Sequence, residues 1–132
     1  MDKKELCKRA VAAAQNSYAP YSNCKVGAAL LTESGKVFCG CNVENSSFSA
    51  TVCAERAAIF SAVSSGETKF EAIAVVGFME GKISERFLPC GVCRQVMSEF
   101  CGEDFPVFVV TDEDKIEEYT LSQLLPRSFT LK

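Results

Sequence analysis

The sequence predicts an α/β fold in which helices cover a mixed β-sheet. Residues 70–78 and 106–111 are almost continuously apolar and rich in β-branched side chains, as strands covered on both faces are. A helix predicted over residues 91–100 lies between them, so the three segments form a βαβ unit. A hairpin predicted earlier in the chain adds antiparallel strands, and this combination is typical of a mixed sheet layered with helices.

The first third of the chain predicts a helix followed by that hairpin. Residues 2–17 place apolar side chains at helical spacing with lysine and arginine on the other side, and Pro20 marks the end of the helix. The apolar runs 25–32 and 36–42 flank the turn-prone segment 33–35, which contains a glycine. We therefore expect these two runs to pair as antiparallel strands.

The remaining elements follow from composition and spacing. Residues 42–51 are polar and irregular, whereas residues 53–65 are rich in alanine and apolar on nearly every side. This second segment predicts a helix that is buried all round, with Gly66 as its C-cap. A short strand over residues 117–120 and a final helix over residues 121–125 complete the order of elements.

Length and charge restrict the kind of protein. The 132 residues, of which 48% are hydrophobic, are sized for a single domain over residues 1–132. A net charge of -3 and a pI near 5.0 do not provide the clustered basic residues that nucleic acids or anionic membranes require. Residues 1–20 lack the apolar stretch of a signal peptide, and no later run is long enough to span a membrane. We therefore expect a cytoplasmic protein with a small-molecule partner.

Three of the eight cysteines stand where predicted helices begin. Cys90 and Cys93 form a Cys-x-x-Cys unit at one helix start, and Cys53 stands at another. Helix N-termini carry a partial positive charge that lowers the pKa of a thiol and stabilises the thiolate that a metal requires. Three thiolates around a tetrahedral zinc leave one position for water, which is the arrangement of catalytic zinc sites.

Other interpretations of these cysteines are open at this point. A structural zinc site would need a fourth ligand, and a thioredoxin-like redox pair would use Cys90 and Cys93 but leave Cys53 unexplained. Cys39, Cys41 or Cys101 could supply that fourth ligand. We nevertheless interpret all five remaining cysteines as buried structural thiols: Cys7, Cys24, Cys39, Cys41 and Cys101.

Glu55 favours a catalytic site over these alternatives. It lies two residues after Cys53 in the first helical turn, where a carboxylate could approach a metal-bound water without binding the metal, although it could also simply stabilise the helix start. Zinc deaminases carry Cys or His, any residue and Glu, followed later by Pro-Cys-x-x-Cys. Cys53-Ala54-Glu55 and the run from Pro89 to Cys93 match both parts of this signature.

Beyond this signature, the chain resembles the small homotetrameric cytidine deaminases of pyrimidine salvage. The matching stretches run through nearly the whole sequence: Tyr21-Ser22, Val26-Gly27-Ala28-Ala29-Leu30, Asn42-Val43-Glu44-Asn45-Ser46-Ser47-Phe48, Cys53-Ala54-Glu55-Arg56, Pro89-Cys90-Gly91-Val92-Cys93-Arg94-Gln95 and Leu124-Leu125-Pro126. The resemblance implies a three-layer α-β-α fold with a mixed sheet of about five strands. It also implies a homotetramer with shared active sites and one zinc ion per chain.

The activity that the resemblance implies is hydrolytic deamination of cytidine and deoxycytidine to uridine and deoxyuridine, with release of ammonia. In this reaction zinc-bound hydroxide attacks C4 of the cytosine ring. Glu55 would accept the water proton, pass it to ring N3 and then assist protonation of the departing amine. Cys53, Cys90 and Cys93 would hold the zinc.

The resemblance also assigns residues to the substrate. Asn42 and Glu44 would bind the ribose hydroxyls, and the backbone N–H of Ala54 would bind the pyrimidine carbonyl. Phe48 and Phe129 would help to enclose the sugar or base from neighbouring subunits. For the two phenylalanines, ordinary core packing is the alternative.

Arg56 and two departures from the family pattern complete the predicted site. Arg56 would donate hydrogen bonds to the ligand thiolates and withdraw charge from the zinc centre. Cys24 stands where the family usually carries Phe, and Leu88 stands where relatives commonly carry Ser. Neither departure affects the metal or the proton transfer, but both leave the range of substrates open.

Three alternative functions have distinguishable predictions. A blasticidin S deaminase would share the zinc signature and size, but Asn42 and Glu44 favour a ribonucleoside. A polynucleotide editor is disfavoured by the acidic charge of the chain. A non-catalytic zinc-binding module predicts four protein ligands, whereas an enzyme predicts three and a water.

Overall fold

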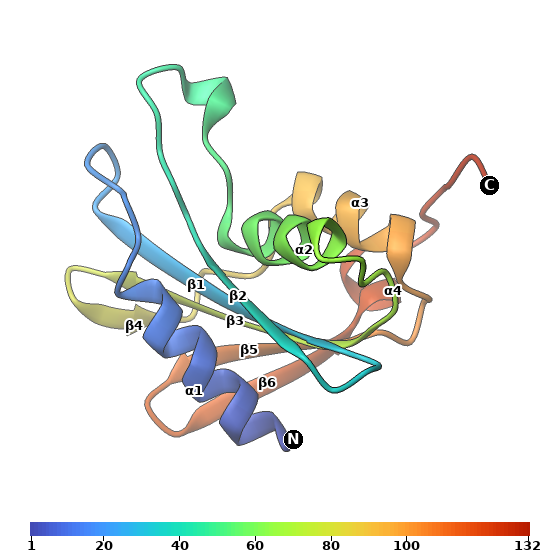
Figure 1. The fold of residues 1–132 in the computed structure, drawn as a ribbon. Helices are drawn as coiled ribbons and strands as arrows, with labels where there is room; N and C mark the ends of the chain where they lie inside the picture. The colour runs from blue at the N-terminus through green and yellow to red at the C-terminus, as the bar shows by residue number, and fades with distance from the viewer.

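The computed structural model describes every residue from Met1 to Lys132 and contains one six-stranded sheet (Figure 1). The strands are β1 (Cys24–Thr32), β2 (Val37–Cys41), β3 (Phe70–Met79), β4 (Lys82–Ser84), β5 (Pro106–Asp112) and β6 (Lys115–Thr120). The helices are α1 (Lys3–Ala14), α2 (Ala54–Ser64), α3 (Gly91–Phe100) and α4 (Leu121–Leu124), with a 3₁₀ turn, η1, at Phe48–Ala50. None of the helices is long and apolar enough to cross a lipid bilayer.

The sheet is mixed, as predicted. Its strand order is β2-β1-β3-β5-β6, and β4 pairs with β3 outside this order. Strands β3 and β5 are parallel and are joined through α3, while every other pair is antiparallel. The predicted βαβ unit and the predicted hairpin are therefore confirmed. The short β4 is the strand beyond the expected five.

Helices cover both faces of the sheet and form three layers. In Figure 1, α1 crosses one face, whereas α2, α3 and α4 gather on the other. The α1 side is packed by an apolar cluster that includes Leu6, Ala10 and Val76. The opposite side is packed by a larger cluster that includes Leu30, Ile59 and Met97. The predicted α-β-α layering is confirmed.

Two strand glycines let the helices approach the sheet closely. A Cβ atom on Gly27 of β1 would lie 2.0 Å from the carbonyl oxygen of Ala10 in α1. A Cβ atom on Gly40 of β2 would lie 2.5 Å from the carbonyl oxygen of Ala54, the first residue of α2. Any side chain at these positions would overlap backbone atoms. The glycine on β2 therefore determines how close the N-terminus of α2 lies to the sheet.

Two predicted helices differ from the structure. Helix α1 ends at Ala14, before the predicted limit, because the chain then turns to pair with the segment after β2, where the N–H of Tyr18 donates to the carbonyl of Asn42. Helix α2 is not buried all round, since it covers the sheet with one side only and leaves Phe60 47% exposed. Ser65 is the C-cap of α2, one residue before the predicted Gly66, which follows the helix end with φ +91°.

Candidate active site

Three cysteine thiols converge where α2 and α3 begin. Cys53 is the N-cap of α2, Cys90 is the N-cap of α3, and Cys93 lies in the first turn of α3. Their sulfur atoms all lie within 4.8 Å of one another. The Cys53 and Cys90 sulfurs are 3.7 Å apart, and those of Cys90 and Cys93 are 3.5 Å apart. No other group of three metal-ligating side chains occurs in the chain.

The local backbone stabilises negative charge at these sulfurs. The first N–H groups of a helix have no partner within the helix, and they carry its positive dipole end. At α3, the N–H of Cys93 points at the Cys90 sulfur from 3.5 Å. At α2 the Cys53 sulfur accepts no such backbone hydrogen bond, so the dipole end of the helix acts there without a direct N–H contact.

Arg56 strengthens this effect at Cys53. The pKa of the Cys53 thiol is lowered to about 5, first by a hydrogen bond from Cys93 and then by one from Arg56, whose Nη2 lies 3.3 Å from the sulfur. The pKa of Cys93 is raised, because this thiol keeps the proton that it shares with Cys53. The pKa of Arg56 is raised in turn, chiefly by its hydrogen bond to Cys53. Arg56 is therefore placed to compensate thiolate charge.

The donor set fits zinc. Thiolates are soft ligands that favour zinc over the hard cations magnesium and calcium, and three of them leave one tetrahedral position open. The buried Nε of Arg56 has no hydrogen-bond partner, so this guanidinium keeps a donor free beside the cluster. The arrangement suits a catalytic metal centre better than a closed structural one.

The other five cysteines lie outside this cluster, so none of them supplies a fourth ligand. The prediction that all five are buried is wrong, because only Cys7 is fully buried and Cys39 is exposed on the edge strand β2. Burial raises the pKa of Cys7 to about 11, against a small opposing effect of Lys3, and raises that of Cys101 to about 12. These two thiols are therefore protonated at neutral pH.

Glu55 lies beside the thiols as a buried carboxyl group. It is the second residue of α2, and only 3% of it is exposed. The pKa of Glu55 is raised to about 7, chiefly by burial and also by the charge of Cys53, against the opposing effects of a backbone hydrogen bond and of Arg56. A bound cation would also lower this pKa. A carboxyl group that titrates near neutrality can both accept and return a proton.

A cavity of about 320 Å³ brings the predicted catalytic and substrate residues together. It is lined by Ser22, Cys24, Val26, Asn42, Glu44, Thr51, Cys53, Ala54, Glu55, Phe87, Leu88 and Cys90. The two departures from the family pattern, Cys24 and Leu88, both belong to this wall. The cavity therefore places a space for a small molecule next to two of the three thiols and to Glu55.

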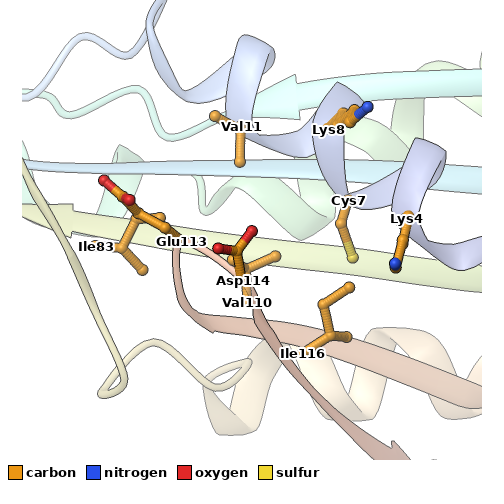
Figure 2. Close-up of a pocket in the computed structure, with 9 residues that line it drawn as sticks. All are labelled: Lys4, Cys7, Lys8, Val11, Ile83, Val110, Glu113, Asp114 and Ile116. Carbon is orange, nitrogen blue, oxygen red and sulfur yellow. The ribbon is translucent and has the colours of Figure 1, made fainter.

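A larger cavity lies elsewhere and lacks such chemistry. It measures about 500 Å³ and lies on the α1 side of the sheet, away from the thiol cluster. Figure 2 shows Lys4 and Lys8 of α1 on one side of it and Glu113 and Asp114 of the β5–β6 turn on another. Its one cysteine, Cys7, is a protonated thiol without neighbouring ligands. Size alone therefore does not identify the active site.

Asn42 and Glu44 are tied to the backbone around the smaller cavity. The Oδ1 of Asn42 accepts from the N–H of Val26 at 2.9 Å, and its Nδ2 donates to the carbonyl of Cys24 at 2.8 Å. Glu44 accepts from the N–H groups of Tyr21 and Ser22 at 2.9 and 3.1 Å. Slight burial raises the pKa of Glu44, but the hydrogen bonds from Ser22 and Tyr21 lower it more. Both side chains are thus held rigidly at the cavity wall.

Phe48 and Phe129 do not line this cavity. Phe48 lies in η1 and is 76% exposed, with its ring 6.0 Å from that of Tyr21. Phe129 lies in the C-terminal tail and is 67% exposed. Neither is a core residue, so the alternative of ordinary packing is wrong for both.

Sequence reasoning missed Phe87 as part of the cavity wall. Its ring occupies the space over Gly77 of β3, where an added Cβ would lie 2.0 Å from the ring. A glycine within a buried strand is the signal that could have indicated such a close neighbour. Ser22, Val26 and Thr51 were also absent from the predicted site.

Comparison with known proteins agrees with this geometry. Residues 1–109 match the family model described as the cytidine and deoxycytidylate deaminase zinc-binding region. The chain belongs to this family. The match and the thiol cluster together identify zinc as the metal of this deaminase, with one ion per chain.

Relatives of this deaminase match it over nearly its full length. A cytidine deaminase of Sporosarcina psychrophila is 48% identical, with 98% of this chain and 93% of the relative covered. The crystal structure of a cytidine deaminase from Burkholderia pseudomallei superimposes with a TM-score of 0.88 at 46% identity, covering 98% of this chain and 100% of that one. A blasticidin-S deaminase of Bacillus cereus is 32% identical, with 80% and 76% of the two chains covered.

Proposed function

We propose that this deaminase hydrolyses cytidine and deoxycytidine to uridine and deoxyuridine, with release of ammonia, in pyrimidine salvage. The observation that carries the proposal is the thiol cluster with Glu55 buried beside it at the wall of one cavity. Asn42 and Glu44 at the same wall, and the cytidine deaminases that match nearly the whole chain, support a nucleoside substrate.

Cys53, Cys90 and Cys93 would hold the zinc, and Glu55 would move the protons. Held by these three thiolates, zinc would lower the pKa of water and so supply the nucleophile for C4 of cytosine near neutral pH. The Glu55 carboxylate accepts the proton from water and delivers it to ring N3. The Glu55 carboxylate then takes the proton of the new C4 hydroxyl and passes it to the amine, so that the C–N bond breaks, ammonia leaves C4 and the oxygen remains as the ring carbonyl.

Three further groups would hold the substrate. The Glu44 carboxylate would accept hydrogen bonds from the ribose hydroxyls and the Asn42 amide would bond to them as well, and their rigid attachment to the backbone supports a fixed orientation of the sugar. Ala54 is the first residue of α2, so its N–H has no helical partner and can donate to the pyrimidine carbonyl. Arg56 would compensate the thiolate charge at Cys53.

We propose a homotetramer with shared active sites. Phe48 and Phe129 project from the surface, and in an assembly they could enclose the substrate of a neighbouring subunit. Phe60 of α2 and Val92 of α3 are also about half exposed, which supports a further apolar contact between copies. We further propose that residues 1–132 are one domain, and that it works in the cytoplasm, where a reducing environment keeps thiolate ligands intact.

An ultraviolet assay with cytidine tests the proposed substrate. The zinc-loaded protein is expected to convert cytidine and deoxycytidine to the uracil products, seen as loss of cytosine absorbance and as ammonia in equal amount. Coordination spectroscopy of the same sample is expected to find three sulfur ligands and one oxygen. Four sulfur ligands without turnover would instead indicate a structural zinc module.

Blasticidin S is the second candidate substrate, because a blasticidin-S deaminase is among the relatives. Asn42 and Glu44 favour a ribose, whereas a ligand without ribose hydroxyls would gain little from them. The same assay with both compounds decides between the candidates. A higher kcat/KM for blasticidin S would replace cytidine as the proposed substrate.

A further inference from the structure

Arg94 connects the zinc-ligand loop to the C-terminal helix. It follows Cys93 in α3, and its guanidinium is partly buried. Its Nε donates to the carbonyl of Pro89 at 2.6 Å, and its Nη1 donates to the carbonyl of Leu124 at 2.7 Å. Pro89 directly precedes the ligand Cys90, and Leu124 is the last residue of α4. One side chain thus fixes two backbone segments that lie far apart in the sequence.

Both carbonyls need such a partner. Leu124 ends α4, and the last carbonyl groups of a helix have no N–H partner within the helix. Pro89 has a fully buried side chain, and its ring provides no N–H through which the loop could be tied. The guanidinium is a planar fork with donors in fixed directions, so it can satisfy two carbonyls at once. A lysine would place a single charged nitrogen there.

We propose that Arg94 is a positioning residue of the zinc site. By holding the Pro89 carbonyl against α3, it fixes the loop that carries Cys90, and with it the cavity-wall residues Phe87 and Leu88. Groups that orient a metal ligand without touching the metal influence both metal affinity and activity. The inference rests on the proposed zinc ligation by Cys90 and Cys93.

The neighbouring side chain has a different attachment. Gln95 donates from Nε2 to the carbonyl of Phe129 at 3.2 Å, and it makes no side-chain bond to the ligand loop. Arg127 is an exposed arginine between α4 and the end of the chain, with no side-chain hydrogen bond or ion pair. Changes at Gln95 and Arg127 therefore serve as controls for the loss of a tail contact and for the loss of a positive charge.

The test measures how fast zinc leaves the loaded protein. Arg94→Gln, Arg94→Lys, Gln95→Ala and Arg127→Gln are each loaded with one zinc, and release to an excess of a chromogenic chelator is followed by absorbance. Arg94→Gln is expected to release zinc about 10-fold to 100-fold faster than the parent. Arg94→Lys is expected to release it faster too, because the single nitrogen of an ammonium group does not reproduce the two separate donor positions of Nε and Nη1. The two controls are expected to match the parent.

Two results would overturn the role of Arg94. Zinc release from Arg94→Gln at the parental rate would show that the loop carrying Cys90 keeps its position without Arg94. Release from Arg94→Lys at the parental rate would show that charge suffices and that the two-carbonyl geometry is irrelevant. Urea midpoints of all samples identify a variant that fails to fold, and Arg94→Lys then decides the question. Because release is measured without substrate, a parent that binds zinc but leaves cytidine unchanged overturns only the proposed substrate.

Discussion

Cys53, Cys90 and Cys93 owe their chemistry to the backbone around them as much as to their sulfur. Each stands at or within one turn of a helix start, where free N–H groups stabilise an anion. Cys7, in the second turn of α1, and Cys101, at the C-terminal end of α3, have the same side chain but lie outside the cluster. Position relative to a helix start therefore distinguishes the clustered cysteines from these two.

Replacement of any of the three clustered cysteines by alanine is expected to abolish zinc binding and activity together. Two thiolates cannot close the tripod that three provide, so metal content determined by mass spectrometry falls from about one zinc per chain towards none. Cys39→Ala is the matched control, since Cys39 is exposed and lies outside the cluster. A Cys53, Cys90 or Cys93 variant with full zinc and turnover would refute the ligand assignment.

Glu55→Gln keeps the shape of the side chain but cannot accept and return a proton. Zinc is expected to remain bound, while kcat for cytidine falls by at least the roughly 10²-fold to 10⁴-fold typical of general acid–base catalysis. Glu71→Gln is the control, because Glu71 is exposed on β3. Near-parental turnover of Glu55→Gln with zinc in place would reduce Glu55 to a helix-start residue.

At the scale of elements, the sheet positions the site through backbone contact. Helix α2 begins directly over Gly40 of β2, and this contact sets the position of Cys53 and Glu55. The site therefore depends on a strand residue that touches neither zinc nor substrate.

Gly40→Ala is expected to displace the start of α2. The added methyl would lie 2.5 Å from both the Ala54 carbonyl oxygen and the Ala58 nitrogen, which are backbone atoms that cannot rotate away. Overpacking of this kind costs about 1–3 kcal/mol of stability, measured as a lower urea midpoint, and kcat is expected to fall with it. Gly102→Ala is the control, because an added methyl there meets nothing within 4 Å. An unchanged Gly40→Ala variant would show that α2 can shift without consequence.

Periodicity and cysteine spacing predicted most of these elements. The βαβ unit, the hairpin and the two helix starts at Cys53 and Cys90 carried strong local signals, namely continuous apolar runs, a glycine turn and Cys-x-x-Cys. The three-residue β4 carried none, because its pairing with β3 depends on contacts across the sheet. The exposed side of α2 was not predicted either, because an alanine-rich segment indicates a helix that is buried on every side.

The site was predicted less completely than the fold. The zinc signature located Cys53, Glu55, Cys90 and Cys93, because their chemistry requires fixed residue types at fixed spacing. The cavity wall was not predictable in this way. Phe87, in the loop between β4 and α3, reaches it only because Gly77 of β3 leaves room for its ring, and such complementarity between two elements has no local signature.

At the scale of the molecule, apolar side chains remain on the surface of one chain. Phe48, Phe60, Val92 and Phe129 are all at least 47% exposed. Light scattering is expected to give a mass of four chains, because contacts between copies would cover such side chains. A monomer with full activity would show that each active site is complete within one subunit.

Truncation after Pro126 separates substrate binding from metal binding. It removes Phe129 but leaves the thiol cluster and the bond from Arg94 to Leu124. KM for cytidine is therefore expected to rise while zinc content stays at about one per chain, and the assembly loosens if the tail crosses an interface. An unchanged KM would exclude the tail from the substrate site.

The meeting of α2 and α3 at one group of thiols also bears on the durability of the fold. Cys53 and Cys90 are 37 positions apart in the chain, so an ion held by both closes a loop as a disulfide would. Closure of a loop of this length is worth about 4 kcal/mol in the chain-entropy model, against a total stability of about 5–15 kcal/mol for a typical domain. The metal is thus a cross-link as well as a catalytic cofactor. Under zinc starvation the segment between Cys53 and Cys90 would lose this cross-link, and the protein would become more susceptible to proteolysis.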